Sequence, residues 1–399
     1  MIRTLSLSLA ASMMAVGAYA QSFTIKGTIP GVKNGTKVKL RAQESGKDVE
    51  AQCLTKGSTF VLTGKVESPM LVELQINDRP ENAYKQDDFA EDRGGKFMLE
   101  AGNYIVSAVC YDSIARNYDM MNPVICHEKN LKIVGGKAQQ QYQEWADATY
   151  DARLKAESLD KQLRNARFRD RSIGGSDTVT VSHLQPLSDA AGIALDKANE
   201  EFVAAHPDYV ISLLLMNRQI EKPFAFQIAD YDKMLAAFAD NYDKARYAEF
   251  QKTVAEMKQY IKGDHYKDLI LETEDGKSVN LKDVVIPGKY NFIDFWASWC
   301  GPCRAAIPSV KKMHQNMGDK LNIISVSVDK RRQDWEEAMK EEKMPWGQFL
   351  VPQTSMKALK DGYYVRFVPS LVIVDSEGKI QLFTNDPQKA HAYLEQKMK

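Results

Sequence analysis

The chain has 399 residues, more than one ordinary domain needs, and this length predicts two or three domains. Hydrophobic residues make up 44% and charged residues 27%, which is typical of a soluble globular protein. Lysine plus arginine equals aspartate plus glutamate at 53 each, so no net charge attracts nucleic acid or anionic lipid, and we expect no nucleic-acid partner.

Residues 1–20 have the pattern of a secretory signal peptide. Arg3 supplies the positive charge, residues 5–17 form a short apolar core, and Ala18-Tyr19-Ala20 gives the small-x-small cleavage pattern. We therefore expect cleavage after Ala20 and delivery to the periplasm, the alternative being a buried N-terminal helix. No later segment approaches the roughly 20 consecutive apolar residues of a membrane helix.

Residues 21–135 are expected to form a β-sandwich. Segments 23–29 and 36–40 alternate apolar and polar residues, as half-buried strands do. Asn34-Gly35 lies between them and suits a tight turn with positive φ, which predicts a hairpin, although Asn34-Gly35-Thr36 also matches a glycosylation acceptor. The stretch 77–95 is polar and predicts a long loop. Further strands are expected at 58–66, 71–76, 96–99, 104–110 and 131–134.

Residues 136–263 are expected to form a helical segment. A Gly/Ser/Thr-rich linker is expected at 172–181, and His206-Pro207-Asp208 separates two helices because proline ends one and aspartate caps the next. Helices are expected at 139–170, 187–205 and 209–217, with two more within 231–261. The aromatic residues at helical spacing are interpreted as packing residues: Tyr142, Trp145, Tyr150, Phe202 and Phe238.

Residues 264–399 alternate strand and helix patterns. A β-α-β half followed by an antiparallel β-β-α half predicts a compact α/β sandwich as the third domain. Strands are expected at 269–273, 278–281, 290–296, 321–328, 371–374 and 380–384. Helices are expected at 304–317, 334–342 and 388–398.

The motif Cys300-Gly301-Pro302-Cys303 stands where an apolar strand runs into a helix. This position places Cys300 at a helix N-terminus, where free N–H groups and the macrodipole favour a thiolate. Motifs of this kind lower a cysteine pKa from about 8.5 to between about 3.5 and 7.5. We expect Cys300 to attack a substrate disulfide and Cys303, deeper and less exposed, to resolve the mixed disulfide. Pro302 suits the first helical turn, which needs no N–H.

Other interpretations of the motif are weaker. A zinc site would need a second ligand pair, and His314 lies roughly 16 Å along the helix from Cys303 at about 1.5 Å per residue. A c-type haem would need histidine at position 304, where Arg304 stands. An inert structural disulfide remains as an alternative. We expect no cofactor and no metal.

Residues 294–304, DFWASWCGPCR, resemble the thioredoxin superfamily, specifically the periplasmic TlpA-like and ResA-like thiol–disulfide interchange proteins. The resemblance covers roughly the last third of the chain. It implies that Asp294 accepts the proton of the second cysteine, or else is only a satisfied buried carboxylate. It also implies that Pro308 bends the active-site helix. The place of Trp299 directly before Cys300 suggests that it faces the substrate, although simple packing remains an alternative. Gly301 and Pro302 are also expected to contact the substrate.

The resemblance further implies a cis bond before Pro369, leaving the backbone of Val368 to pair with an extended substrate segment, although an ordinary turn proline remains an alternative. Many relatives carry glutamate three residues after the second cysteine, and this chain has Ala306. Asp294 is then the obvious proton acceptor, and any specificity that the glutamate confers is in doubt.

The Gly-Pro spacer favours a reductant, because thioredoxin has a potential of about −270 mV and DsbA about −120 mV. The resemblance implies recharging by a membrane electron donor of the DsbD or CcdA type, with apocytochrome c and mis-oxidised periplasmic proteins as substrates. The N-terminal part resembles a poorly characterised β domain that precedes such modules. Alternative functions are partner binding through the N-terminal domains, or homodimerisation through the helices as in some disulfide isomerases.

Three further cysteines lie in the N-terminal part. Cys110 and Cys126 either form a disulfide, which an oxidising compartment permits, or are two buried thiols. Cys53 has no evident partner and is expected to be buried.

Overall fold

The computed structural model describes residues 21–44, 46–49, 51–77, 93–114, 130–172 and 178–398. They divide into two compact units, one ending at Leu215 with 240–245 added, the other made of 216–239 and 246–398. The predicted signal peptide, Cys126 and most of the predicted loop 77–95 lie outside the described residues. Within the described part, no helix is long and apolar enough to cross a membrane.

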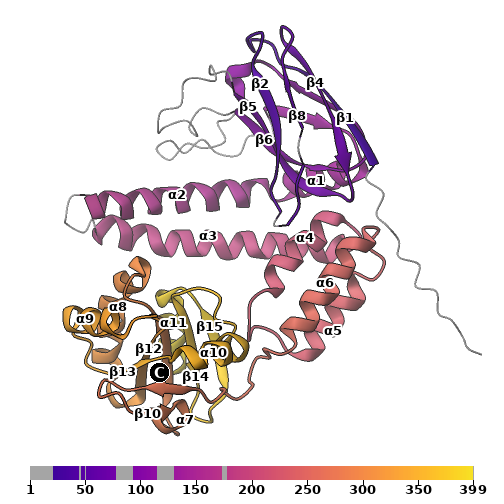
Figure 1. The fold of residues 1–399 in the computed structure, drawn as a ribbon. Helices are drawn as coiled ribbons and strands as arrows, with labels where there is room; N and C mark the ends of the chain where they lie inside the picture. The colour runs from indigo at the N-terminus through magenta and orange to yellow at the C-terminus, as the bar shows by residue number, and fades with distance from the viewer. Residues whose placement is uncertain are drawn as a thin grey trace, which may run out of the picture. The chain divides into compact units, whose positions relative to one another are not determined.

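The N-terminal unit begins with a β-sandwich of two four-stranded sheets (Figure 1). Their orders are β4-β1-β7-β8 and β3-β2-β5-β6. Inward-facing side chains such as Ile25, Leu62 and Val72 form one apolar core, so the predicted alternation and the sandwich are confirmed. The strands are β1 (Gln21–Thr28), β2 (Lys37–Ala42), β3 (Gln52–Leu54), β4 (Thr59–Val66), β5 (Met70–Asn77), β6 (Arg93–Leu99), β7 (Gly102–Ala108) and β8 (Leu131–Val134).

The predicted hairpin around Asn34-Gly35 is wrong. Gly35 does have the positive φ of a tight turn, at 81°. However, β1 pairs with β4 and β7, whereas β2 pairs with β3 and β5 in the other sheet. The turn therefore carries the chain from one sheet to the other. The prediction failed because alternation identifies a strand without identifying the strand that it pairs with. In the predicted loop 77–95, residues 93–95 already belong to β6.

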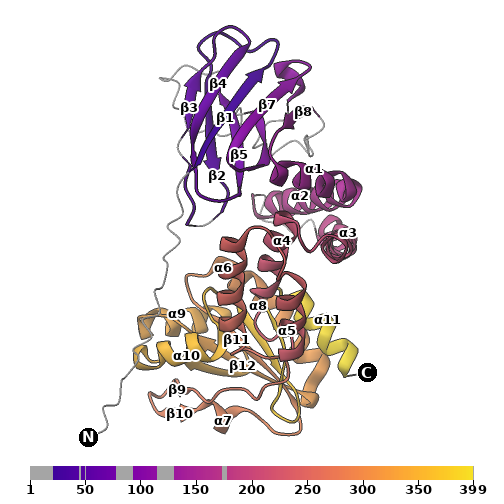
Figure 2. The same ribbon diagram turned by 90° about the vertical axis from the view of Figure 1, so that its right-hand side faces the viewer.

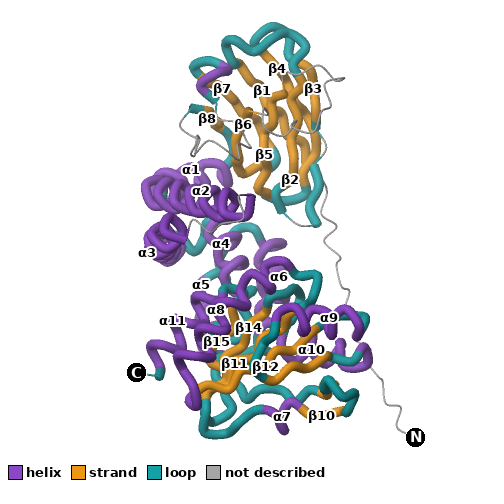
Figure 3. The backbone as a smooth tube through the Cα atoms, turned by 90° about the vertical axis from the view of Figure 1, so that its left-hand side faces the viewer, coloured by secondary structure: helices purple, strands orange, loops and turns teal. Residues whose placement is uncertain are grey.

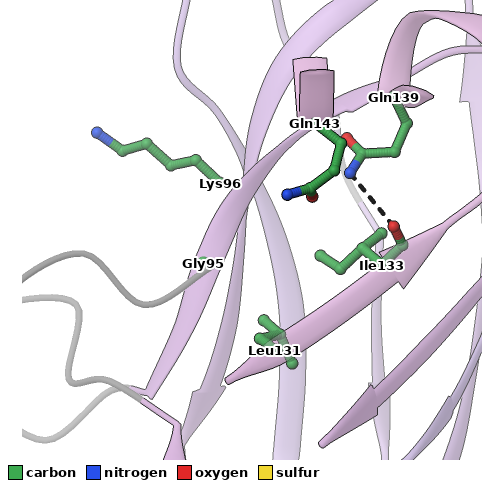
Figure 4. Close-up of a pocket in the computed structure, with 6 residues that line it drawn as sticks. All are labelled: Gly95, Lys96, Leu131, Ile133, Gln139 and Gln143. Carbon is green, nitrogen blue, oxygen red and sulfur yellow. Dashed lines mark hydrogen bonds between the residues drawn. The ribbon is translucent and has the colours of Figure 1, made fainter. Parts of the chain in front are cut away.

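Gln139 joins the outer strands β6 and β8 of the two sheets. It is 3% exposed, its Oε1 accepts from Met98 N at 3.0 Å, and its Nε2 donates to Ile133 O at 3.3 Å. Figure 4 shows the second bond beside a pocket of about 10 Å³, room for roughly one water. The side chain thus satisfies two strand-edge groups that would otherwise be unpaired. We interpret the pocket as part of this junction between β6 and β8.

Gln139→Ala is expected to lower the free energy of unfolding by about 1–3 kcal/mol, because the Met98 N–H and the Ile133 carbonyl lose their partner. Chemical denaturation followed by far-UV circular dichroism measures the change. Gln143→Ala is the matched control on the same helix, because Gln143 bonds only to Asp147 there. Its expected change is within about 0.5 kcal/mol. Equal losses in both variants would contradict the assigned role of Gln139.

The helical segment contains α1 (Lys137–Ala148), α2 (Tyr150–Ser172), α3 (Thr178–Ala205), α4 (Val210–Ile220), α5 (Ile228–Ala237) and α6 (Lys244–Met257). The single helix predicted at 139–170 is two helices, divided at Thr149, whose side chain bonds to Trp145 O and to Arg153. α3 includes Pro186 and starts inside the predicted linker. Tyr142, Phe202 and Phe238 are buried, as expected of packing residues.

The C-terminal part is built on a seven-stranded sheet of order β10-β9-β13-β12-β11-β14-β15, with helices on its faces (Figures 2 and 3). The mixed sheet with helices confirms the predicted α/β domain. β13, α7 and α10 were not predicted. The strands are β9 (Ile270–Glu272), β10 (Ser278–Asn280), β11 (Tyr290–Trp296), β12 (Leu321–Ser327), β13 (Gly347–Leu350), β14 (Ser370–Val374) and β15 (Ile380–Thr384). The helices are α7 (Leu281–Val284), α8 (Gly301–Met317), α9 (Arg332–Glu342), α10 (Met356–Tyr363) and α11 (Pro387–Lys397).

β11 lies in the centre of this sheet, parallel to β12 and antiparallel to β14. Because helices cover both of its faces, β11 is buried from Asn291 to Trp296, and most of its side chains are apolar. Phe292 packs with Val310 and Met313 of α8, whereas Phe295 on the opposite face contacts Tyr363 of α10. This alternation fixes which side of the sheet each β11 side chain faces.

Candidate active site

Cys300 lies at the N-cap of α8, directly beyond the end of β11. Its Sγ accepts a hydrogen bond from Cys303 N at 3.1 Å, and Gly301 and Pro302 occupy the first helical positions. Pro302 lacks only an N–H that the first turn leaves unpaired. The two sulfurs form a disulfide with a Cα–Cα distance of 5.3 Å. The strand-to-helix transition thus places Cys300 where free N–H groups and the helix dipole stabilise a thiolate.

The expected difference in exposure between the two cysteines is not present in the disulfide form. Cys300 and Cys303 are each 4% exposed. Both belong to an apolar cluster with Trp296 and with Trp335 of α9. The local surface is instead formed by Gly301 and Pro302, which are exposed, and by neighbouring aromatic residues.

The segment 367–370 packs beside the disulfide. The Val368–Pro369 bond is cis, and Val368 packs against the cluster that contains Cys300 and Cys303. Ser370 Oγ donates to Phe367 O at 2.7 Å, which fixes the turn before β14. The structure therefore brings the predicted Val368-Pro369 segment to the redox pair, 68 positions away in sequence from Cys300.

Two large aromatic side chains stand exposed next to these loops. Trp299, directly before Cys300, is 70% exposed, and Phe367, directly before Val368, is 51% exposed. Sequence reasoning identified Trp299 and missed Phe367, because its only signal was its position before the Val368-Pro369 pair. Exposed aromatic side chains beside a reactive centre offer contact area to an apolar segment of a partner.

Asp329 holds the loop that leads to Cys300. It is 1% exposed, and its carboxylate accepts from Ser298 N at 2.9 Å, Ser298 Oγ at 2.8 Å and Ser327 Oγ at 2.7 Å. These bonds satisfy a buried carboxylate and position the residue before Trp299. Sequence reasoning missed this contact. The available signal was serine at 325 and 327 within a mostly apolar strand.

Asp294 is buried on the side of β11 that faces α8. It stands between Phe292, which packs on α8, and Trp296, which packs on the cysteines. Burial raises the pKa of Asp294 from 3.8 to about 7, opposed by a hydrogen bond from Ser325 Oγ at 3.3 Å. A carboxyl group with this proton affinity can both take up and release a proton near neutral pH.

Charged groups near the start of α8 are paired. Arg304 donates to Glu342 and to Glu341 at 2.6 Å each, which places two carboxylates against one guanidinium and raises the pKa of Arg304. Ala306, three residues after Cys303, adds no acid there. Among the residues that the structure describes, no three His, Cys, Asp or Glu side chains gather as metal ligands.

Two family descriptions match the chain. "Thioredoxin-like" matches residues 288–380, and "Domain of unknown function (DUF4369)" matches residues 23–142. The thiol-disulfide oxidoreductase ResA of Bacillus subtilis is 24% identical over 135 residues, 34% of this chain and 73% of that protein. Thioredoxin of Rhodospirillum rubrum is 36% identical over 92 residues, 23% of this chain and 64% of that protein.

The chain covers different shares of its other relatives. The chain spans 24% of a probable nucleoredoxin 1 of Arabidopsis thaliana, with 30% identity over 142 residues, 32% of this chain. Among solved structures, the thioredoxin domain of a thiol-disulfide oxidoreductase from Bacteroides vulgatus is 30% identical, with a TM-score of 0.32, 34% of this chain and 95% of that chain covered. The chain thus has a C-terminal domain of the thioredoxin-like family, with thiol–disulfide oxidoreductases among its relatives, and an N-terminal DUF4369 domain.

Proposed function

We propose that the chain is an exported thiol–disulfide oxidoreductase that reduces disulfides in periplasmic proteins. The observation that supports this most directly is the Cys300–Cys303 disulfide at the N-terminus of α8, with the buried carboxyl group of Asp294 on the preceding strand β11 and exposed aromatic residues beside the cysteines. Exposed aromatic side chains such as Trp299 and Phe367 beside the two cysteines offer a contact surface that suits a protein substrate.

The proposed reaction starts from the reduced dithiol. The Cys300 thiolate attacks one sulfur of a substrate disulfide, the S–S bond breaks, and the other substrate sulfur leaves as a thiolate. Cys303 then gives its proton to ionised Asp294 and attacks Cys300 Sγ. The Cys300–Cys303 disulfide forms and the second substrate sulfur leaves. Two electrons pass from the dithiol to the substrate.

The direction, location and partners are part of the proposal. The Gly-Pro spacer favours a reductant, since the thioredoxin potential of about −270 mV is far below the value of about −120 mV for DsbA. Residues 1–20 have the signal-peptide pattern for export. A reductant in the periplasm needs electrons from a membrane donor of the DsbD or CcdA type, and apocytochrome c is a suitable substrate class.

Insulin reduction tests the activity. With dithiothreitol as electron source, wild-type protein is expected to accelerate insulin precipitation, and Cys300→Ser is expected to lower the rate to the uncatalysed background, because serine supplies no thiolate. Cys53→Ser is the matched control, because Cys53 is a free, half-buried thiol of β3. If Cys300→Ser reduces insulin as fast as the wild type, the proposed activity is refuted.

Partner recognition by the β-sandwich is a second candidate function. Val61, Ile105 and Val134 are each more than half exposed, on the outer face of the β4-β1-β7-β8 sheet. Their strands align them in one row with Lys26 between the first two, because Lys26 pairs with both Val61 and Ile105, and Ile105 with Val134. A partner bound there, including a second copy of the chain, would stay bound without either redox cysteine.

A further inference from the structure

Two residues from neighbouring strands connect to Asp294. Ser325 lies opposite Asp294 in the parallel pairing of β11 with β12, and it is 0% exposed. Its Oγ donates to Asp294 Oδ2 at 3.3 Å. Trp346, directly before β13, donates from Nε1 to the same Ser325 Oγ at 2.9 Å. The three side chains thus form one hydrogen-bonded line, Trp346–Ser325–Asp294, which leads from the half-buried indole to the buried carboxyl group.

The chemistry of these groups fixes the direction of the line. An indole N–H can only donate, so the Trp346 bond occupies a lone pair of the Ser325 oxygen. The hydroxyl hydrogen of Ser325 is then available to Asp294, whose ionised form can only accept. Hydrogen bonds in such a chain polarise one another, so the indole strengthens the hydroxyl as a donor. The arrangement favours the carboxylate over the protonated acid.

We propose that Ser325 and Trp346 are positioning residues that set the proton affinity of Asp294 for the step in which Cys303 resolves the mixed disulfide. This inference rests on the proposed oxidoreductase function. Neither residue has to touch the sulfurs or the substrate for this role. They act through Asp294 alone.

The surroundings of Asp294 leave few other groups to set its charge. Its neighbour on β14 is Leu371, which does not titrate, and Ser325 is its neighbour on β12. On α8, Cys303 belongs to the cluster that contains Trp296, and the ring of His314 lies 5.6 Å from the indole of Trp346. Burial raises the pKa of Asp294, and the Ser325 hydroxyl is the group that lowers it. The hydroxyl therefore opposes the desolvation directly.

Ser325→Ala tests the proposal through the proton affinity of the carboxyl group. Carbon-13 NMR of the Asp294 carboxyl in the oxidised and reduced full-length protein gives its pKa without reference to activity. Loss of a donor to the carboxylate is expected to raise this pKa by about one unit, a roughly tenfold change in the ionisation constant. The midpoint of the pH profile of insulin reduction is expected to rise by the same amount, because only the ionised Asp294 can accept the Cys303 proton.

Two further variants test the line itself. Trp346→Phe is expected to shift the pKa of Asp294 in the same direction by less, because the hydroxyl stays and only its polarisation is lost. Ser325→Thr keeps a hydroxyl and is expected to restore a pKa near that of the wild type. Ser327→Ala is the matched control, since this buried serine on the same strand donates to Asp329 and not to Asp294.

The outcomes separate the inference from the proposed function. An unchanged Asp294 pKa in Ser325→Ala, with native circular dichroism and an intact Cys300–Cys303 disulfide, overturns the inference even if insulin is reduced. An equal shift in Ser327→Ala overturns it as well. A wild-type protein that fails to reduce insulin refutes the function, while the NMR titration still tests the line. In an Asp294→Asn background, Ser325→Ala is expected to leave the pH profile of insulin reduction unchanged.

Discussion

Asp294→Asn is expected to unfold less readily than the wild type at pH 8 and to lose this advantage near pH 4. The folded carboxyl group has a pKa of about 7 against an ordinary value of 3.8, because burial disfavours its charge. The folded state therefore binds this proton more tightly than the unfolded state. The stabilisation that this proton gives the folded state is complete below pH 3.8, the ordinary pKa, and is lost as the pH rises through about 7.

The size of the effect follows from the shift. A difference of about three pKa units corresponds to on the order of 4 kcal/mol of destabilisation of the wild type above pH 7. Asparagine removes this cost, and its carbonyl can still accept from Ser325 Oγ, but its buried amide lacks a partner at a cost of about 1–3 kcal/mol. We therefore expect a net gain of a few kcal/mol at pH 8. Urea unfolding at pH 4, 6 and 8, followed by tryptophan fluorescence, measures it.

Asp329→Asn is the matched control for this experiment. Asp329 is also buried, but both of its oxygens accept hydrogen bonds from Ser298 and Ser327. An amide group can accept through one atom only, so this variant is expected to be less stable than the wild type at pH 8. A loss of stability in Asp294→Asn at pH 8, or a gain that does not depend on pH, would contradict the raised proton affinity of Asp294.

The centre of the site could be predicted from the sequence because its parts are contiguous. Residues 294–304 include Asp294, the strand end and both cysteines, and strand and helix patterns are enough to place Cys300 at a helix N-terminus. The burial and the role of Asp294 were implied by the resemblance to thioredoxins. The residues that support them come from other strands. Ser325 meets Asp294 through the β11–β12 register, and Asp329 meets Ser298 through a loop beyond β12. The pattern of one segment does not identify which residue of a distant strand or loop lies beside it, so these contacts were not predictable.

The N-terminal unit shows the same limit. Alternating residues identified β1 and β2 as strands, but adjacency in sequence wrongly suggested a hairpin, because the two strands contribute to different layers of the sandwich. The helical propensity of 139–170 was correct, but the break at Thr149 depends on Arg153 bonding back to Ala146 O and to Thr149 Oγ1. Local side-chain bonds of this kind, four and seven residues apart in the chain, are not visible in a propensity pattern.

Cys303→Ser is expected to abolish turnover and to accumulate a mixed disulfide between Cys300 and the substrate. The attack of Cys300 needs only its own thiolate, so the first step proceeds, whereas serine cannot displace the substrate sulfur in the second. Insulin reduction is expected to fall at least a hundredfold, on the order of 3 kcal/mol in the barrier. Non-reducing electrophoresis and mass spectrometry of the covalent species, sensitive to dithiothreitol, measure the trapped complex.

The controls decide what the trapped complex means. Cys300→Ser retains Cys303, Cys53, Cys110 and Cys126, so any adduct that it forms comes from cysteines other than the proposed nucleophile. A variant with both redox cysteines replaced reports partners that bind without covalent chemistry, as recognition by the β-sandwich requires. Specific adducts in Cys303→Ser alone support an enzyme whose N-cap thiolate attacks its substrate. Equal adducts in Cys303→Ser and Cys300→Ser would show that the N-terminus of α8 does not activate Cys300, and the mechanism would fail at its first step.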